Sequence, residues 1–262
     1  MKTKSKANVT ANFDLKIGDE VVSLCATVPD SKVSAVELIP VYQLLTNQIV
    51  SHSIEQSVKA GKNISCKDGC ASCCSQPVPV TELEAIHLAN VVKRLPESRQ
   101  SRIRQRFADS QAALADAGLE ESLKEITNLD KESRRDIGVK YFSLGLNCPF
   151  LENKSCSIYS DRPLECREYL VTSEPKHCEQ LNAKEIKHIT SKLRLTPALT
   201  KQSQECFGEK SPGWMLMLYC LDWAKSDKTR LRKKSAKLVF TFQRFIYRSS
   251  AKIHYGWHQM CA

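Results

Sequence analysis

Apolar and polar residues near the start of the chain alternate on both sides of a Gly18-Asp19 pair. A period of two residues is typical of a half-buried strand, and Gly-Asp suits a tight turn. The pattern therefore predicts a short β-hairpin. Its alternating apolar residues are Phe13, Leu15 and Ile17 on one arm and Val22, Leu24 and Ala26 on the other.

From Pro40 onward the apolar residues follow a helical period up to Gly61, which is placed to cap the C-terminus of the predicted helix. This stripe consists of Leu44, Leu45, Ile49, Ile54 and Val58. A second helix is predicted to start at the capping box of Thr81 and Glu84 and to end near Leu95-Pro96. The pattern thus predicts that the cysteines between residues 66 and 74 lie in a loop between these two helices.

Four more helices follow from the same signals. One is expected over residues 97–117, with Ile103, Phe107 and Leu114 inward and Gly118 as its end, and another over 131–142. Asp161-Arg162-Pro163 is interpreted as the cap and first turn of a helix that carries Cys166, and Pro212 as the start of a last helix through Trp214, Leu218 and Leu221. The predicted fold is mainly α with small β elements.

No internal repeat or low-complexity run divides the 262 residues. We expect a single irregular helical domain organised around a cysteine-ligated metal site. Within it, residues 1–36 form an N-terminal β-hairpin segment, 37–205 a helical cysteine-cluster domain and 206–262 a C-terminal basic helical element.

Eight of the twelve cysteines lie in two clusters. Thiolates are soft ligands, and two groups of four suit a pair of tetrahedral sites, or an iron–sulfur cluster with a zinc ion. We therefore predict a metal site ligated by both clusters. The predicted ligands are Cys66, Cys70, Cys73, Cys74, Cys148, Cys156, Cys166 and Cys178.

The first cluster, CKDGCASCC, is compact, and Gly69 permits a left-handed turn that would let it fold back on itself. Adjacent side chains point apart in extended backbone, so Cys73 and Cys74 are expected to serve different metals, or one of them to pack in the core. In the second cluster, Cys166 is expected in a first helical turn, where the helix dipole favours a thiolate. Arg162 and Arg167 are near enough to offset thiolate charge.

A disulfide framework is the main alternative for so many cysteines. The Lys-rich segment 1–10 leads into no apolar stretch, so we expect a cytoplasmic chain whose thiols stay reduced. The length and the 42% hydrophobic composition also suffice for a core without covalent links. The other alternative, that cysteines simply fill core positions, suits the four isolated ones, Cys25, Cys206, Cys220 and Cys261.

These motifs resemble the YkgJ-like cysteine cluster family, a zinc- or iron-chelating domain with a C-x3-C-x2-C-C motif. The run CKDGCASCC corresponds to its first motif, and CPFLENKSCSIYSDRPLECREY to its second. The resemblance covers residues 64–178 and implies binding of zinc, iron or an iron–sulfur cluster. Bacterial flagellin lysine N-methylases share the same cysteine motifs, which brings in a protein-modifying activity as one further expectation.

The spacing of Cys66, Cys70 and Cys73 is also that of radical S-adenosylmethionine enzymes. Ser72 stands where those enzymes place an aromatic residue, and no series of alternating strands and helices predicts their barrel. His177, beside Cys178, is a possible replacement ligand, although a surface position is the expectation we prefer. Phosphate-binding Gly-rich loops and hydrolase motifs are absent from the sequence.

Positive charge is concentrated at the C-terminal end, where ten basic residues and one acidic residue lie between Lys225 and Lys252. On a helix, Arg230, Lys234 and Lys237 would share one stripe, which is interpreted as a solvated face rather than a docking site. Nucleic acid is therefore a possible but not a favoured partner. The sequence contains no run of eighteen consecutive apolar residues, so no membrane span is predicted.

The sequence thus predicts a metal-chelating protein that binds iron, as an iron–sulfur cluster, or zinc, with a redox or protein-modifying role and an unidentified protein or redox partner. The alternative is a zinc-stabilised binding module, without enzymatic activity, whose basic C-terminal helix docks an acidic partner.

Overall fold

The computed structural model describes residues 8–17, 20–29, 34–67, 69–180, 184–189, 191–208 and 210–226. Most of them are helical, and the strands form three antiparallel pairs. The fold is therefore mainly α with small β elements, as predicted. In chain order the elements are β1 (Asn8–Ile17), β2 (Glu20–Pro29), α1 (Ile39–Lys59), β3 (Pro79–Thr81), α2 (Glu82–Lys93), α3 (Glu97–Asp116), α4 (Glu120–Lys124), α5 (Lys131–Ser143), β4 (Leu151–Glu152), β5 (Ser155–Cys156), α6 (Leu164–Glu168), α7 (Pro175–Glu179), α8 (Thr196–Phe207), β6 (Trp214–Leu216) and α9 (Cys220–Lys225).

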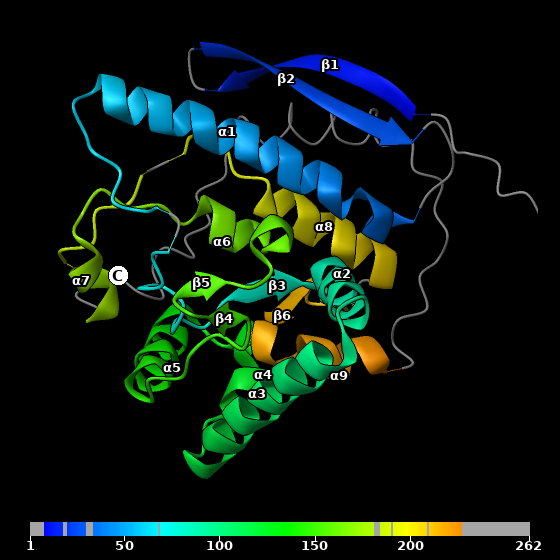
Figure 1. Cartoon of the computed structure of the whole chain (residues 1–262), viewed down its shortest axis with the longest axis vertical. Coiled ribbons are helices and arrows are strands. Elements are labelled where there is room, and N and C mark those ends of the chain that lie inside the picture. Colours follow the sequence, from blue (N-terminus) through cyan, green and yellow to red (C-terminus); the bar gives the residue numbers. More distant parts are fainter. Residues whose placement is uncertain are drawn as a thin grey trace, which may run out of the picture.

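The N-terminal hairpin of β1 and β2 lies along α1 (Figure 1). Leu15, Leu24 and Ala26 are buried in the core shared with α1, while Val21 remains 67% exposed. The Gln48 side chain of α1 donates to the Cys25 carbonyl at 2.8 Å and accepts from the Cys25 N–H at 3.0 Å. The predicted hairpin is confirmed, and its Gly18-Asp19 turn lies outside the described residues.

Helix α1 ends as its sequence predicts. Gly61 has a φ of 74°, and the Lys62 N–H bonds the Ser57 carbonyl at 2.9 Å across it. Of the predicted apolar stripe, Leu45 and Ile49 are buried, but Leu44 is 42% exposed. The buried stripe on α1 is therefore narrower than the pattern indicated.

Helix α2 begins at the predicted capping box. The Thr81 hydroxyl accepts from the Glu84 N–H at 3.1 Å, and the Glu84 carboxylate accepts from the Thr81 N–H at 2.8 Å. The other oxygen of Glu84 accepts from the Leu164 N–H at 2.8 Å, at the start of α6. One buried carboxylate thus fixes α6, which carries Cys166, to α2.

Two apolar cores meet at α2. One core packs α2, α3, α5 and α9 around Leu88, Phe107 and Phe150, and the other packs the hairpin, α1 and α8 around Leu83. Figure 1 shows the corresponding layers, with the hairpin and α1 at one end and α3 and α5 at the other. The cysteine-bearing loops lie between these layers.

Two predicted helix starts are wrong. Residues Trp214–Leu216 form strand β6, which pairs with β3, because Gly213 at φ 80° turns the chain after Pro212. Asp161 ends a 3-10 turn (Tyr159–Asp161), and α6 begins at Leu164. The Asp161 carboxylate instead lies 3.1 Å from Nε2 of the buried His87.

Among the described residues, none of the helices combines the length and the apolar character needed to cross a bilayer. The strand pairs described here form no barrel of alternating strands and helices, in line with the sequence-based argument against a radical S-adenosylmethionine fold.

We predict that Glu84→Ala lowers the free energy of unfolding by about 3 kcal/mol, because it removes the helix cap and leaves buried N–H groups of Thr81 and Leu164 without an acceptor. Thr81→Val, which loses the hydroxyl but keeps the carboxylate, should cost about 1 kcal/mol. Urea denaturation followed by circular dichroism measures both losses. Equal losses would show that the bond to α6 contributes nothing.

Candidate metal centre

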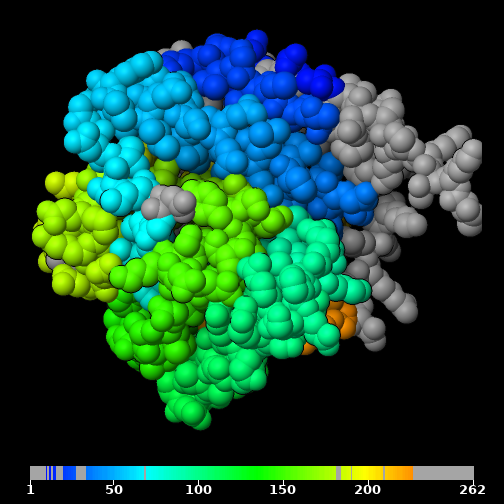
Figure 2. All heavy atoms as spheres, viewed as in Figure 1, coloured from blue at the N-terminus to red at the C-terminus, as the bar shows by residue number. Residues whose placement is uncertain are grey.

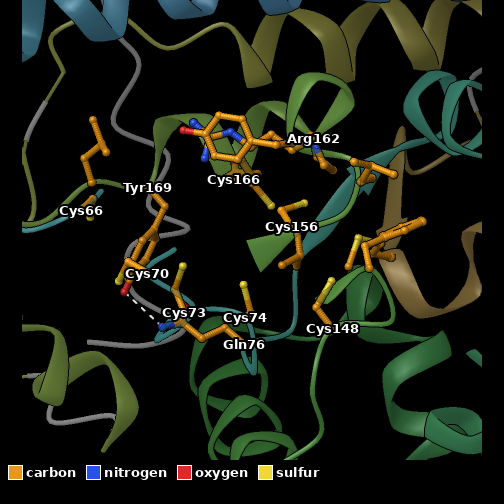
Figure 3. A pocket seen from close by; sticks show the side chains of 18 of the residues that line it. Cys66, Cys70, Cys73, Cys74, Gln76, Cys148, Cys156, Arg162, Cys166 and Tyr169 are labelled. Carbon is orange, nitrogen blue, oxygen red and sulfur yellow. Dashed lines mark hydrogen bonds between the residues drawn. The ribbon is translucent and has the colours of Figure 1, made fainter. Parts of the chain in front are cut away.

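Seven of the eight predicted ligands line one cavity with a volume of about 300 Å³. They come from the loop after α1, the segment after α5, strand β5 and helix α6. Figure 3 shows the labelled thiols around this space, and Figure 2 shows the loop after α1, in cyan, beside the green segment with the later cysteines. The structure therefore brings together the cysteines Cys66, Cys70, Cys73, Cys74, Cys148, Cys156 and Cys166.

The first cluster folds as consecutive turns. The Cys70 N–H bonds the Lys67 carbonyl at 3.1 Å, the Cys74 N–H bonds the Ala71 carbonyl at 2.8 Å, and Gly69 has the left-handed φ of 79° that its position suggested. The expectation that the Cys73 and Cys74 side chains point apart is wrong, because this backbone is not extended. Their thiols are hydrogen-bonded, and this bond together with burial raises the pKa of Cys73 well above its usual value.

Backbone hydrogen bonds tie the two clusters together. The Cys148 N–H donates to the Cys74 carbonyl at 2.7 Å, and the Ser65 N–H donates to the Val171 carbonyl at 3.0 Å. These bonds join segments that are distant in sequence on both sides of the cavity. The cysteines are thus gathered by tertiary structure, as predicted for the second cluster.

Backbone amides point at several of the sulfurs. The Val171 N–H lies 3.3 Å from Cys66 Sγ. Burial raises the pKa of Cys148 to about 12 despite hydrogen bonds from the backbone at Phe150 and Leu151, which lower it. Burial likewise raises the pKa of Cys156, opposed by the Ile158 backbone. Amide donors directed at sulfur favour the thiolate, which is the form that binds metal.

Burial decides the protonation of Cys166. Its pKa is raised well above the usual value, first by burial and then by the thiols of Cys148, Cys73 and Cys156. The predicted lowering by the helix dipole is not observed, since α6 has only five residues and its dipole is small. Burial therefore keeps Cys166 in its neutral thiol form at neutral pH.

Arg162 supplies positive charge to the cavity wall. Its guanidinium lies 4.1 Å from the centre of the Tyr159 ring. Opposing the effect of burial, it lowers the pKa of Cys66, Cys156 and Cys166.

Arg167, unlike Arg162, is not among the residues that line the cavity. It is 4% exposed, and it donates to Asn47 Oδ1 and the Arg162 carbonyl, both at 2.9 Å. Arg167 therefore mainly holds α6 against α1, although its charge also lowers the pKa of Cys156, which burial raises.

Cys178 lies behind the cavity wall rather than in it. It is 3% exposed and packs in a small cluster with Val171, Cys66 and Tyr169. Burial and the thiols of Cys73, Cys66 and Cys70 raise its pKa to about 11, whereas a hydrogen bond with the Tyr169 side chain lowers it. The same tyrosine hydroxyl accepts from Gln76 Nε2 at 3.1 Å (Figure 3).

Sequence reasoning missed His188. Its imidazole lines the cavity and meets the Tyr169 ring edge-on, with the ring centres 5.0 Å apart, and burial lowers its pKa. No spacing relates His188 to the cysteines, so only the packing of the chain reveals it. His177, considered as a replacement ligand, lies on α7 and is not among the cavity-lining residues.

The isolated cysteines in the described part of the chain do not line this cavity, and the expectation that they fill core positions is confirmed for Cys220 but wrong for Cys25. Cys25 is exposed, Cys206 is half-buried and Cys220 is buried, while Cys261 lies outside the described residues. All cysteines in the described part of the chain are free thiols. In the same part of the chain, no three cysteine, histidine or acidic side chains stand in ready-made coordination geometry, so a bound metal would draw the sulfurs together.

Residues 65–191 match the model of the CxxCxxCC family, described as a "Putative zinc- or iron-chelating domain". The matched region contains all eight clustered cysteines, so this part of the chain is similar to the chelating domain. The match confirms the resemblance found in the two motifs and supports chelation of zinc or iron as the general role of the domain. No curated protein and no solved structure matches the chain.

We predict that iodoacetamide at pH 8 modifies Cys25 faster than Cys148 in the metal-free protein by at least about tenfold, because only thiolates react and burial raises the pKa of Cys148 to about 12. Peptide mass spectrometry over time measures both rates. In urea the two cysteines should react alike. Equal rates in the folded protein would contradict the burial of the cavity thiols.

Proposed function

We propose that this protein chelates iron or zinc through the thiols of its cysteine cavity. One observation carries the proposal, namely that seven cysteines from four separate segments line the same cavity. Isolated buried cysteines would each fill a separate apolar position, as Cys220 does. The predicted ligand set of eight, including Cys178 behind the wall, is retained in this proposal.

The donor set suits both metals, since thiolates are preferred by zinc and by iron–sulfur clusters. Amide donors near Cys66, Cys148 and Cys156 would stabilise bound thiolates, and Arg162 would offset part of their negative charge. An iron–sulfur cluster would supply electron transfer when bound, whereas a closed zinc site would supply folding free energy.

A redox role, with a separate redox partner, belongs to the iron form of this proposal. Burial by Phe150 and Ile158 and hydrogen bonding to sulfur are the means by which a protein sets the reduction potential of such a centre. The protein-modifying role rests only on the resemblance to flagellin lysine N-methylases. The alternative of a zinc-stabilised docking module rests on a basic element that lies almost entirely outside the described residues.

Anaerobic purification followed by metal analysis and absorption spectroscopy tests the proposal. Iron with a broad absorbance in the blue would establish the iron–sulfur form, and a colourless protein with stoichiometric zinc would establish the zinc form. A full-length protein that retains neither metal, and takes up neither after reduction, would overturn the proposed function.

We predict that Cys70→Ser lowers both the metal content and the soluble yield, because bound metal links the first cluster to the rest of the cavity. Cys25→Ser, on the exposed face of the hairpin, is the matched control and should change neither. Elemental analysis of both variants gives the comparison. Unchanged metal in Cys70→Ser would remove Cys70 from the site.

Metal affinity should rise with pH. Burial raises the pKa of Cys148 to about 12, and burial with neighbouring thiols raises that of Cys178 to about 11, so both are protonated at neutral pH and must release their protons to bind metal. Each proton released should strengthen apparent binding by about tenfold per pH unit. Competition with a chelator of known affinity measures this slope, and a flat profile would contradict binding by buried neutral thiols.

A further inference from the structure

The cysteine cavity has an apolar wall that a metal ion does not require. Apart from the cysteines, most of its lining side chains are apolar or aromatic, and its volume is about 300 Å³. A single ion occupies no more space than a water molecule, whose share of liquid volume is about 30 Å³. A cavity of this volume, lined mainly by apolar groups with a few polar ones, is typical of a site for a small organic molecule.

Helix α1 supplies part of this wall. Its residues Val50 and Ile54 line the cavity and are only partly buried. Val78, before β3, and Leu170, after α6, also line it and are likewise only partly buried. Ile54, which belongs to the predicted apolar stripe of α1, thus faces the cavity instead of the core. These four side chains give the apolar body of a ligand a surface to cover.

Arg162 is the polar feature of the cavity that has an unmet hydrogen bond. Its Nε–H is buried and has no hydrogen-bond acceptor among the described residues. Its guanidinium lies over the Tyr159 ring, 4.1 Å from the ring centre, which fixes its position without neutralising its charge. Figure 3 shows Arg162 across the cavity from Cys74 and Gln76. Because a buried donor without an acceptor is destabilising, it commonly marks the place of an absent partner.

The other charged groups of the cavity leave this positive charge available. Glu165, the acidic side chain among the described lining residues, already pairs with Arg194 at 2.6 Å. Lys67 also lines the cavity, is exposed and adds a second positive charge. Tyr159 is 47% exposed, so the cavity reaches the surface beside Arg162. An apolar cavity with a cationic end is complementary to an organic carboxylate, which the planar fork of arginine binds through two parallel hydrogen bonds.

We propose that the cavity binds a small organic carboxylate, whose charged group pairs with Arg162 and whose apolar body covers the wall supplied by α1. This inference goes beyond the proposed chelating function, because neither Arg162 nor the apolar wall is a metal ligand. A phosphate group suits the site less well, since it carries up to two charges and three acceptor oxygens, whereas the wall offers one buried guanidinium.

Calorimetric titration of the reduced, full-length protein as purified tests the proposal with matched ligands. The pairs are phenylacetate with phenylacetamide and 3-phenylpropionate with 3-phenylpropionamide, in which acid and amide share an apolar body and differ in charge. One acid should bind per chain, at least about tenfold more tightly than its amide, because hydrogen bonds to a charged group are the stronger ones. Equal affinities for acid and amide, or binding of no member of either pair, would overturn the proposal.

Variants then assign the two parts of the site. Arg162→Gln, which keeps the backbone carbonyl that Gln43 and Arg167 contact, should abolish the preference for the acid and leave amide binding unchanged. Arg162→Lys should keep only part of the preference, because it retains the charge without the fork. Ile54→Ala should weaken acid and amide alike, by about fivefold. Arg102→Gln, at an exposed position on α3, is the control and should bind as wild type.

Thermal unfolding of each variant shows that it is folded, and Arg162→Lys carries the test if Arg162→Gln is not. An acid-to-amide ratio that stays unchanged in a folded Arg162 variant would place the carboxylate elsewhere, a bound metal included, and would overturn the proposal.

Metal analysis of the same samples separates this inference from the proposed function. Metal retained by a protein that does not prefer the acid would overturn the carboxylate site and leave chelation in place. Acid binding by a protein that takes up neither iron nor zinc would support the site and overturn chelation. Loss of metal in Arg162→Gln, with equal wild-type affinities for acid and amide, would limit Arg162 to offsetting thiolate charge.

Discussion

The hydrogen bond from the Cys148 N–H to the Cys74 carbonyl is the contact on which the candidate site depends. It is 2.7 Å long and joins the two cysteine clusters at the floor of the cavity. Together with the bond from the Ser65 N–H to the Val171 carbonyl, it links the two runs directly as well as through the intervening helices α2 to α5. A direct hydrogen bond between two short backbone segments fixes the distance between their side chains more tightly than a series of packed helices can.

Buried carboxylates likewise join separate elements of the scaffold through hydrogen bonds. Glu84 connects the start of α2 to the start of α6, and Glu168 at the end of α6 accepts from the Leu195 N–H at 2.7 Å and from Arg194 at 2.8 Å. Helix α6 is short, so it contributes little stability of its own. Its position, and with it the position of Cys166, is therefore set by acidic side chains that satisfy helix ends and a buried arginine.

Opposing forces act on the cavity thiols. Burial favours their neutral forms, while backbone amides and Arg162 favour thiolates. For Cys66, Cys148 and Cys156 burial has the larger effect on the pKa, because a lone buried charge loses more hydration free energy than a few hydrogen bonds restore. A bound cation would reverse this balance by compensating several thiolates at once, so metal binding, proton release and closure of the site are coupled.

The sequence alone predicts the hairpin, the helices α1, α2, α3 and α5 and the cap of α2, because they depend on neighbours a few residues apart: the hairpin alternation, the capping box of Thr81 and Glu84, and the left-handed glycines. It also determined which cysteines belong together, since their spacing is a local property. Three features emerge only from the packing of the chain: Trp214–Leu216 pair as a strand with β3, Cys73 and Cys74 turn their thiols toward each other, and His188 lines the cavity wall. Those features depend on burial and on partners distant in the chain, and no local pattern carries that information.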